Sequence, residues 1–217
     1  MPGGSRPEAL VPGMCGSCHA ASLYDACMGP LELLGLKRRR RELLATVAGR
    51  VIEAGAGTGA NLRHMPWHRI EQLALVDLEL SPRLLRLPRL LRNGFAHHVA
   101  VEMRQESVER LPYPSGLFDA AVSTLLFCSV DNPLLGMQEL HRVLAPGGRL
   151  YFIEHVLPPC GLLRAPLRAL NPLWRRLSNG CNLVRDTAAI IERAGFAFER
   201  LERSGAGVLI SGVALKG

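Results

Sequence analysis

The residues most suggestive of chemistry form a glycine-rich turn at positions 53–59, which reads Glu-Ala-Gly-Ala-Gly-Thr-Gly. Glycines let the backbone turn sharply and approach a ligand that a Cβ atom would exclude. A helix after such a turn would offer amide N–H groups to a carboxylate or phosphate. The turn therefore predicts a cofactor site, whose expected members are Glu53, Gly55, Ala56, Gly57, Gly59 and Asn61.

Two kinds of cofactor suit this turn. Gly55, Gly57 and Ala60 satisfy the G-x-G-x-x-G/A pattern of nicotinamide-dependent oxidoreductases. The acid directly before the turn and the glycine at its fifth position, Gly59, favour a different, adenosine-containing cofactor. Further along, Glu79-Leu80-Ser81-Pro82 places an acid-x-Ser-Pro sequence at a strand end, where a carboxylate can accept both ribose hydroxyls. Glu79 fits that pattern better than Asp77, which is the alternative.

Candidates for the substrate side lie mainly where later strands are expected to end. Doubly wound sheets place their active sites at the carboxyl ends of strands. We expect His155 to be catalytic, with a structural histidine as the alternative. Tyr24, Cys128 and Glu154 are the expected substrate contacts, although Cys128 could equally be a small buried apolar residue.

The elements that must position these residues alternate regularly. Short apolar runs at 50–54, 72–78, 98–103, 118–124 and 149–154 alternate with helical patterns at 59–65, 82–93, 132–144 and 186–194, after a first helix at 31–47. Such alternation predicts a doubly wound, mostly parallel α/β sheet with right-handed crossovers. Segments 196–202 and 207–215, joined by a turn at 204–206, predict a C-terminal antiparallel hairpin and hence seven strands. Pro88 should interrupt the helix at 82–93.

Length and composition favour one domain. The 217 residues, 48% of them hydrophobic, predict a flexible leader at 1–21 and a single domain at 22–217, with a candidate substrate lid at 160–180. Pro166 and Pro172 argue against one continuous helix in that lid. Neither a signal peptide nor an apolar run of about 18 residues is visible, so we expect a cytoplasmic protein. Cys15-Gly16-Ser17-Cys18-His19 resembles a haem-attachment sequence or half a zinc site; we interpret it as chance spacing and expect no metal.

The net charge of +7 comes almost entirely from arginine. Two clusters stand out, at 37–41 and at Arg164, Arg168, Arg175 and Arg176. Basic segments of this kind could contact an anionic membrane surface peripherally. No basic stripe is interleaved with aromatic residues, so we expect no nucleic-acid partner. Oligomeric state does not follow from these patterns.

Three later segments carry a family resemblance. Gln105 to Tyr113, Phe118 to Val122 and Glu139 to Gly148 resemble, in order, three motifs of class I S-adenosylmethionine-dependent methyltransferases, and the resemblance covers roughly residues 22–215. It implies a Rossmann-like fold and S-adenosylmethionine as cofactor. It also implies cofactor contacts from Glu106, Ser107, Thr124 and Leu125, in addition to Glu79 and Leu80. Gln105-Glu106-Ser107 stands where many such enzymes have Gly-Asp-Ala; Glu106 could accept from the adenine amino group.

Four shorter stretches, at 57–61, 126–130, 152–156 and 179–183, resemble a group of thiol S-methyltransferases of the endoplasmic reticulum and their bacterial relatives. This sequence differs from that group in lacking a hydrophobic N-terminal anchor. The resemblance implies methyl transfer to a small, apolar acceptor, with thiol sulfur first, phospholipid nitrogen second and a quinone-type carbon third. A thiol ionises partly near neutral pH, so it needs only mild help from a base such as His155. A non-catalytic nucleic-acid-binding protein on the same fold is the rival hypothesis.

Overall fold

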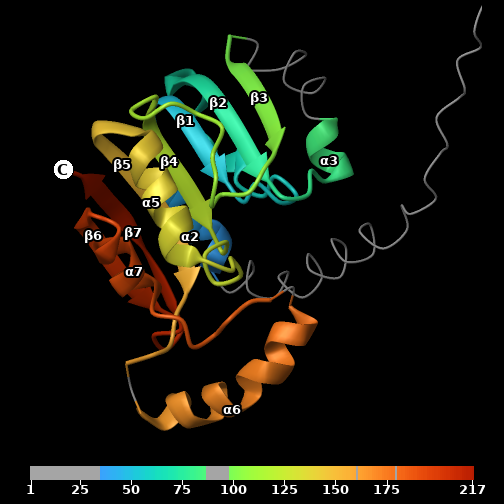
Figure 1. The fold of residues 1–217 in the computed structure, drawn as a ribbon, viewed down its shortest axis with the longest axis vertical. Coiled ribbons are helices and arrows are strands. Elements are labelled where there is room, and N and C mark those ends of the chain that lie inside the picture. The colour runs from blue at the N-terminus through green and yellow to red at the C-terminus, as the bar shows by residue number, and fades with distance from the viewer. Residues whose placement is uncertain (1–34, 87–97, 160, 179) are drawn as a thin grey trace, which may run out of the picture.

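Seven strands form one sheet in the computed structural model, which describes residues 35–86, 98–159, 161–178 and 180–217. Their order across the sheet is β3-β2-β1-β4-β5-β7-β6 (Figure 1). The strands are β1 Gly49–Ala54, β2 Ile70–Asp77, β3 Ala100–Gln105, β4 Phe118–Thr124, β5 Leu144–His155, β6 Phe196–Ser204 and β7 Leu209–Lys216.

The sheet confirms the predicted fold class. Strands β1 to β5 are parallel, whereas β7 pairs antiparallel with both β5 and β6. The chain adds β2 and β3 on one side of β1 and then returns to place β4 and β5 on the other side. The direction of winding therefore changes between β1 and β4, which is where open α/β sheets bind ligands at the strands' carboxyl ends.

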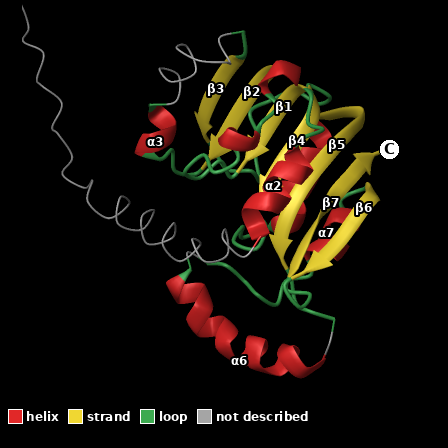
Figure 2. Ribbon diagram, turned by 180° about the vertical axis from the view of Figure 1, so that it is seen from behind, coloured by secondary structure: helices red, strands yellow, loops and turns green. Residues whose placement is uncertain are grey.

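Helices cover both faces of the sheet. Helices α5 (Pro133–Val143) and α7 (Thr187–Arg193) lie on the face towards the viewer in Figure 1, and α2 (Lys37–Leu44) lies on the opposite face, seen in Figure 2. Asn132 and Asp186 cap α5 and α7 by accepting hydrogen bonds from the amides three residues on, at 3.1 and 3.2 Å.

Alternate residues along the strands belong to two apolar clusters, one on each face of the sheet. Ile52 and Phe152 pack on the side of α5 and α7, where Leu140 is also completely buried. Their neighbours Val51 and Ile153 point the other way, into the cluster that contains Leu44 of α2. The central strands are therefore buried on both faces, so their backbones hold the strand ends rigidly.

Two predicted helices differ in the structure. The helix expected at 59–65 is reduced to a single 3-10 turn, η2 (Leu62–His64), followed by a second one, η3 (Trp67–Arg69). Pro66 explains this, because the residue before a proline avoids helical geometry and Met65 is extended, with ψ 133°. For the helix expected at 82–93, α3 (Pro82–Leu85) is present, and residues 87–97 with Pro88 lie outside the described residues.

The candidate lid also differs from expectation. Helix α6 (Gly161–Leu177) runs without a break through both Pro166 and Pro172. Each proline removes one backbone hydrogen bond, which frees the carbonyls of Leu162 and Arg168. Both residues are exposed, so water can satisfy those carbonyls and the helix continues. Figure 1 places α6 beyond the carboxyl ends of the strands and away from both covered faces.

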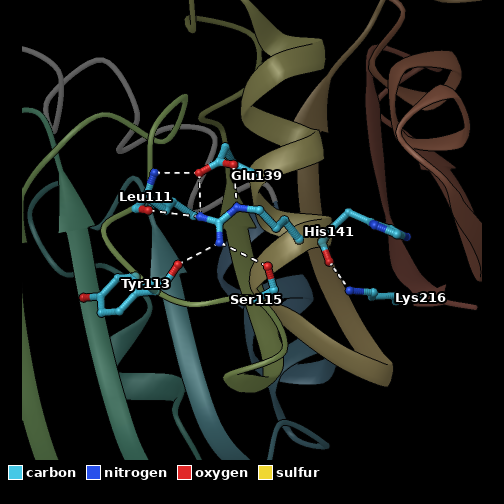
Figure 3. A network of polar contacts seen from close by, with 7 residues as sticks. Leu111, Tyr113, Ser115, Glu139, His141 and Lys216 are labelled. Atoms are coloured by element: carbon cyan, nitrogen blue, oxygen red, sulfur yellow. Dashed lines mark hydrogen bonds and ion pairs between the residues drawn. The ribbon is translucent and has the colours of Figure 1, made fainter.

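Arg142 of α5 anchors the segment that follows β3. Figure 3 labels the contacted residues, among them Leu111, Tyr113 and Glu139. Its guanidinium donates to both carboxylate oxygens of Glu139, at 2.7 and 2.8 Å, and to the carbonyls of Tyr113 and Leu111, at 2.7 and 3.1 Å. The Leu111 amide donates back to Glu139 at 2.8 Å. Nearby, the Lys216 ammonium donates to the His141 carbonyl at 2.6 Å. The segment between β3 and β4 is thereby held against α5.

Within the described residues, no helix combines the length and apolar character needed to cross a membrane.

Candidate active site

The glycine turn follows β1 as predicted, with three glycines in left-handed geometry: Gly55, Gly57 and Gly59 have φ values of 72°, 53° and 81°. A Cβ atom on Gly57 would meet nothing closer than the Gly55 carbonyl oxygen at 4.0 Å. That side of the turn is open, so a ligand can approach the backbone closely there.

The turn's amides are used differently from the expectation. Gly55 and Ala56 donate to the Val76 carbonyl at 2.8 and 3.2 Å, and Gly57 donates to a carboxylate oxygen of Asp77 at 2.7 Å. These bonds lock the turn to the end of β2. Because a 3-10 turn and not an α-helix follows, the expected array of helix amides is missing, and the turn contributes mainly close backbone approach.

A cavity of about 270 Å³ opens beside the turn. Among the predicted cofactor residues, Gly55, Glu106 and Ser107 line it, as does the alternative ribose acid Asp77. Glu79 is exposed and is not among the lining residues, and neither is Leu80. The Glu106 amide donates to the Asp77 carbonyl at 3.0 Å, which joins the segment after β3 to the end of β2. Apolar side chains, among them Val76 and Leu126, line the cavity together with these polar groups.

Beneath the turn lies a buried polar network. Asn61 Nδ2 donates to Glu53 Oε1 at 2.9 Å and to Thr124 Oγ1 at 3.0 Å. Arg40 Nη1 donates to Asn61 Oδ1 at 2.6 Å and to Thr124 Oγ1 at 2.7 Å. Glu53, Asn61 and Arg40 are at most 5% exposed, so the network ties α2, β1 and β4 together. The sequence predictions included three of its members and missed Arg40.

Glu53 is the buried acidic residue of this network, and its pKa is raised. Burial raises the pKa of its carboxyl to about 7, against the lowering effects of Asn61 and Arg40. Its second oxygen, Oε2, is buried without a hydrogen-bond partner in the described part of the chain. That oxygen leaves a place for a proton or for a polar group of a bound molecule.

Glu154 holds the loop after β4. One of its carboxylate oxygens accepts from the amides of Leu126 and Phe127 at 3.1 and 3.0 Å, and the other accepts from the amide of Cys128 at 3.2 Å. Burial raises the pKa of Glu154 to about 7, although these hydrogen bonds lower it. Leu125, at the start of the loop, has φ 56°, a strained conformation for a residue with a side chain. The expected substrate residue Glu154 thus lies under the loop and shapes it.

Two thiols and an imidazole meet at the ends of β4 and β5. Ligand-capable atoms of Cys128, His155 and Cys181 all lie within 4.8 Å of one another, and Cys181 Sγ is 3.6 Å from His155 Nδ1. Both cysteines are buried and His155 is half-buried. Hydrogen bonding between the two thiols lowers the pKa of Cys181 and raises that of Cys128. Cys181 was not among the predicted site residues, although it lies in the stretch 179–183 that resembles thiol S-methyltransferases.

Helix α6 contacts this region through the buried Asn171 and through Trp174, whose side chain hydrogen-bonds to Cys181. Asn171 donates to Asn182 Oδ1 at 3.0 Å and accepts from the Leu183 amide at 2.9 Å. Large apolar side chains on α6 are exposed, among them Leu162, Leu170, Leu173 and Trp174. The lid role of α6 stays a prediction, as does membrane contact through its arginines. Tyr24, the leader at 1–21 and the Cys15-Cys18-His19 group lie outside the described residues.

Comparisons with known proteins show which family this chain resembles. A family profile described as a methyltransferase domain matches residues 52–152. The chain is 33% identical to thiol S-methyltransferase TMT1B of Mus musculus over 182 residues, covering 77% of this chain and 71% of that protein. It is 34% identical to the Rattus norvegicus protein of the same name over 160 residues, covering 70% of this chain and 62% of the rat protein's length.

A solved structure shares the fold. The S-adenosylmethionine-dependent methyltransferase of Mesorhizobium loti superimposes with a TM-score of 0.59 at 22% identity, covering 82% of this chain and 95% of that one.

Proposed function

Because this chain belongs to the S-adenosylmethionine-dependent methyltransferases, we propose that it transfers the cofactor's methyl group to the sulfur of a small, apolar thiol. The observation that carries the sulfur acceptor is the pair of rodent relatives, both named thiol S-methyltransferases, at about one-third identity over most of this chain.

Residues of the cavity and of the glycine turn bind different parts of the cofactor. Asp77 accepts from the ribose hydroxyls, since each oxygen of its carboxylate has one intramolecular bond and keeps further acceptor capacity. Glu106 and Ser107 lie where the adenine ring enters. The open face of Gly57 admits the methionine part.

Arg40 supplies the positive charge that the methionine carboxylate requires. The turn's amides at residues 55, 56, 57 and 59 are already engaged within the protein, so they offer little to an anion. The buried Arg40 guanidinium contacts Asn61 and Thr124, both next to the turn and the end of β4. A charge-assisted hydrogen bond from a buried guanidinium is strong enough to fix the carboxylate.

The protein's remaining task is alignment. S-adenosylmethionine, when bound, supplies a methyl group already activated by the sulfonium. Glu154 holds the loop at 125–128, and Leu126 of this loop lines the cavity. Two residues further on, Cys128 lies close to His155 and Cys181. An acceptor sulfur would be held beside this cluster, so that the protein orients it towards the methyl group of a bound cofactor. Helix α6 excludes water from that approach.

The test is a methyl-transfer assay with radiolabelled cofactor. The acceptors are alkane thiols of increasing length, the alcohols of matching length, phosphatidylethanolamine and a reduced quinone. Labelled thioether should form from the thiols, with kcat/KM rising with chain length until the apolar site is filled, and the matched alcohols should remain unlabelled.

Gly57→Val serves as the inactive control, because its side chain would fill the cofactor's approach. Methylation of phosphatidylethanolamine or the quinol with no turnover of any thiol would reject the sulfur acceptor.

A further inference from the structure

The cluster of Cys128, His155 and Cys181 has the composition of a metal site. Cys128 lies just after β4, His155 ends β5, and Cys181 follows α6, so three separate parts of the fold converge. Both cysteines are free thiols. Two thiolates and one imidazole form a donor set that selects zinc over magnesium or calcium.

The backbone around these ligands is braced without any ion. The Cys128 amide donates to Glu154, the residue that precedes His155 in the chain. The Asn182 amide, next to Cys181, donates to the Cys128 carbonyl at 2.8 Å. Arg185 reinforces the same contact by donating to the carbonyls of Phe127 and Val130 at 2.5 and 2.7 Å. A site whose ligands are held in place loses little conformational entropy on binding an ion.

The observed spacing matches a tetrahedral zinc ion. With Zn–S of about 2.3 Å and Zn–N of about 2.0–2.1 Å, the sulfur and nitrogen of such a site lie roughly 3.5 Å apart. Cys181 Sγ and His155 Nδ1 are 3.6 Å apart. The third ligand atom, Cys128 Sγ, lies within 4.8 Å of both and would have to reach about 3.8 Å from the other sulfur to complete such a site.

We propose that Cys128, His155 and Cys181 bind one zinc ion whose fourth position receives the sulfur of the methyl acceptor. The zinc site itself follows from the cluster, whereas the acceptor's place on it rests on the proposed thiol methylation. Three protein ligands with one open position are the arrangement of catalytic zinc, and closed structural sites have four. This assignment replaces the earlier expectation that the chain has no metal and that His155 acts as a base.

The reaction balances without any redox partner. On binding zinc, the acceptor thiol releases its proton to solvent, because a coordinated thiol is deprotonated. The resulting thiolate forms a new S–CH3 bond as the sulfonium's S–CH3 bond breaks and its electron pair returns to the cofactor sulfur. The products are a neutral thioether and S-adenosylhomocysteine. A thioether is a poorer zinc ligand than a thiolate, so the product leaves.

Cobalt is the spectroscopic probe. Full-length protein is stripped with a chelator under reducing conditions and titrated with Co²⁺, which gives an intense thiolate-to-cobalt charge-transfer band in a tetrahedral sulfur site. We expect the band to saturate at one equivalent and to disappear on adding Zn²⁺. Cys128→Ser and Cys181→Ser should each strongly weaken the band, and His155→Ala should weaken binding while keeping thiolate absorption.

The matched control is the double variant Cys15→Ser/Cys18→Ser, which removes two closely spaced members of the chain's four other cysteines and should leave the band unchanged. Calorimetry with S-adenosylhomocysteine checks that the Cys181→Ser protein is folded, since Cys181 does not line the cofactor cavity. A wild-type protein without the band, or a band lost only in the Cys15/Cys18 variant, overturns the zinc site. Recovery of Cys128 and Cys181 as a disulfide from freshly purified protein also overturns it.

Activity separates this inference from the proposed function. Thiol methylation that continues at full rate in chelator-stripped protein would overturn the role of zinc and leave thiol methylation standing. One bound equivalent of cobalt in a protein that methylates only other acceptors would keep the metal site, reject the thiol acceptor and overturn the acceptor's place on the ion.

Discussion

Asp77 offers the sharpest test of the cofactor site. It lines the cavity at the end of β2, and its carboxylate accepts from the amides of Gly57 and Glu79 at 2.7 and 3.1 Å. Glu79, favoured by the acid-x-Ser-Pro pattern, is exposed two residues further on. If Asp77 binds the ribose, Asp77→Ala removes hydrogen bonds to a charged acceptor. Such a loss costs about 1.5–3 kcal/mol, which is a roughly 10- to 150-fold weaker Kd.

Titration calorimetry with S-adenosylhomocysteine measures this directly. Asp77→Ala also loses the bond to Gly57, which shapes the turn, so a second ligand is needed to isolate the ribose contact. An analogue without the ribose 2′-hydroxyl should bind wild type more weakly, whereas Asp77→Ala should bind both ligands nearly equally. If the missing 2′-hydroxyl weakened binding equally in wild type and in Asp77→Ala, Asp77 would not interact with that hydroxyl.

Glu79→Ala is the matched control and should change the affinity by less than about threefold, in line with an exposed substitution. A larger effect for Glu79→Ala than for Asp77→Ala would refute the reasoning and return the ribose contact to the residue that the sequence pattern favours.

Three further outcomes are expected. Gly57→Val should abolish cofactor binding measured by calorimetry, whereas Gly147→Val, an equally left-handed glycine with open space around it, should leave the affinity unchanged; equal losses would contradict the role of the turn. Arg40→Met should weaken S-adenosylmethionine at least about tenfold but hardly affect decarboxylated S-adenosylmethionine, since only the former has the anion; parallel losses would make Arg40 purely structural. Glu53 has a folded pKa of about 7, above its ordinary 4.5, so the stability it contributes is complete below pH 4.5 and is lost as the pH rises through 7. Denaturant unfolding of wild type and Glu53→Gln across this range should therefore show wild type losing stability relative to the variant, and a constant difference would contradict the raised pKa.

The fold was largely predictable because its signals are local. Most parallel strands are short apolar runs followed by a helical pattern, β3 being the exception, and the Ser204 to Ala206 turn marks the final hairpin. The failures came from prolines, whose effect depends on surroundings. Pro66 ended a helix that the apolar pattern favoured, whereas Pro166 and Pro172 were tolerated in the exposed helix α6.

The site was predictable only in part, because its remaining members are defined by contact across the fold. Glu53, Asn61 and Ser107 follow recognisable sequence patterns. The first two belong to the buried polar network, and Ser107 lines the cavity. Arg40 was hidden among five consecutive basic residues, of which only it is buried. The resemblance at 179–183 drew attention to the segment of Cys181, but the approach of its sulfur to His155 depends on the folded chain and not on local sequence.

The position of β7 bears on how the protein emerges from the ribosome. Strand β7 is synthesised after β6, yet it lies between β5 and β6 in the sheet. Until residues 209–216 leave the exit tunnel, β6 has no backbone partner in this sheet, and β5 presents a long unpaired edge next to the finished parallel strands. Such an edge is a template for pairing between nascent chains. Slowed translation through the last hairpin should therefore favour aggregation of the growing chain, even though every catalytic element has already been made.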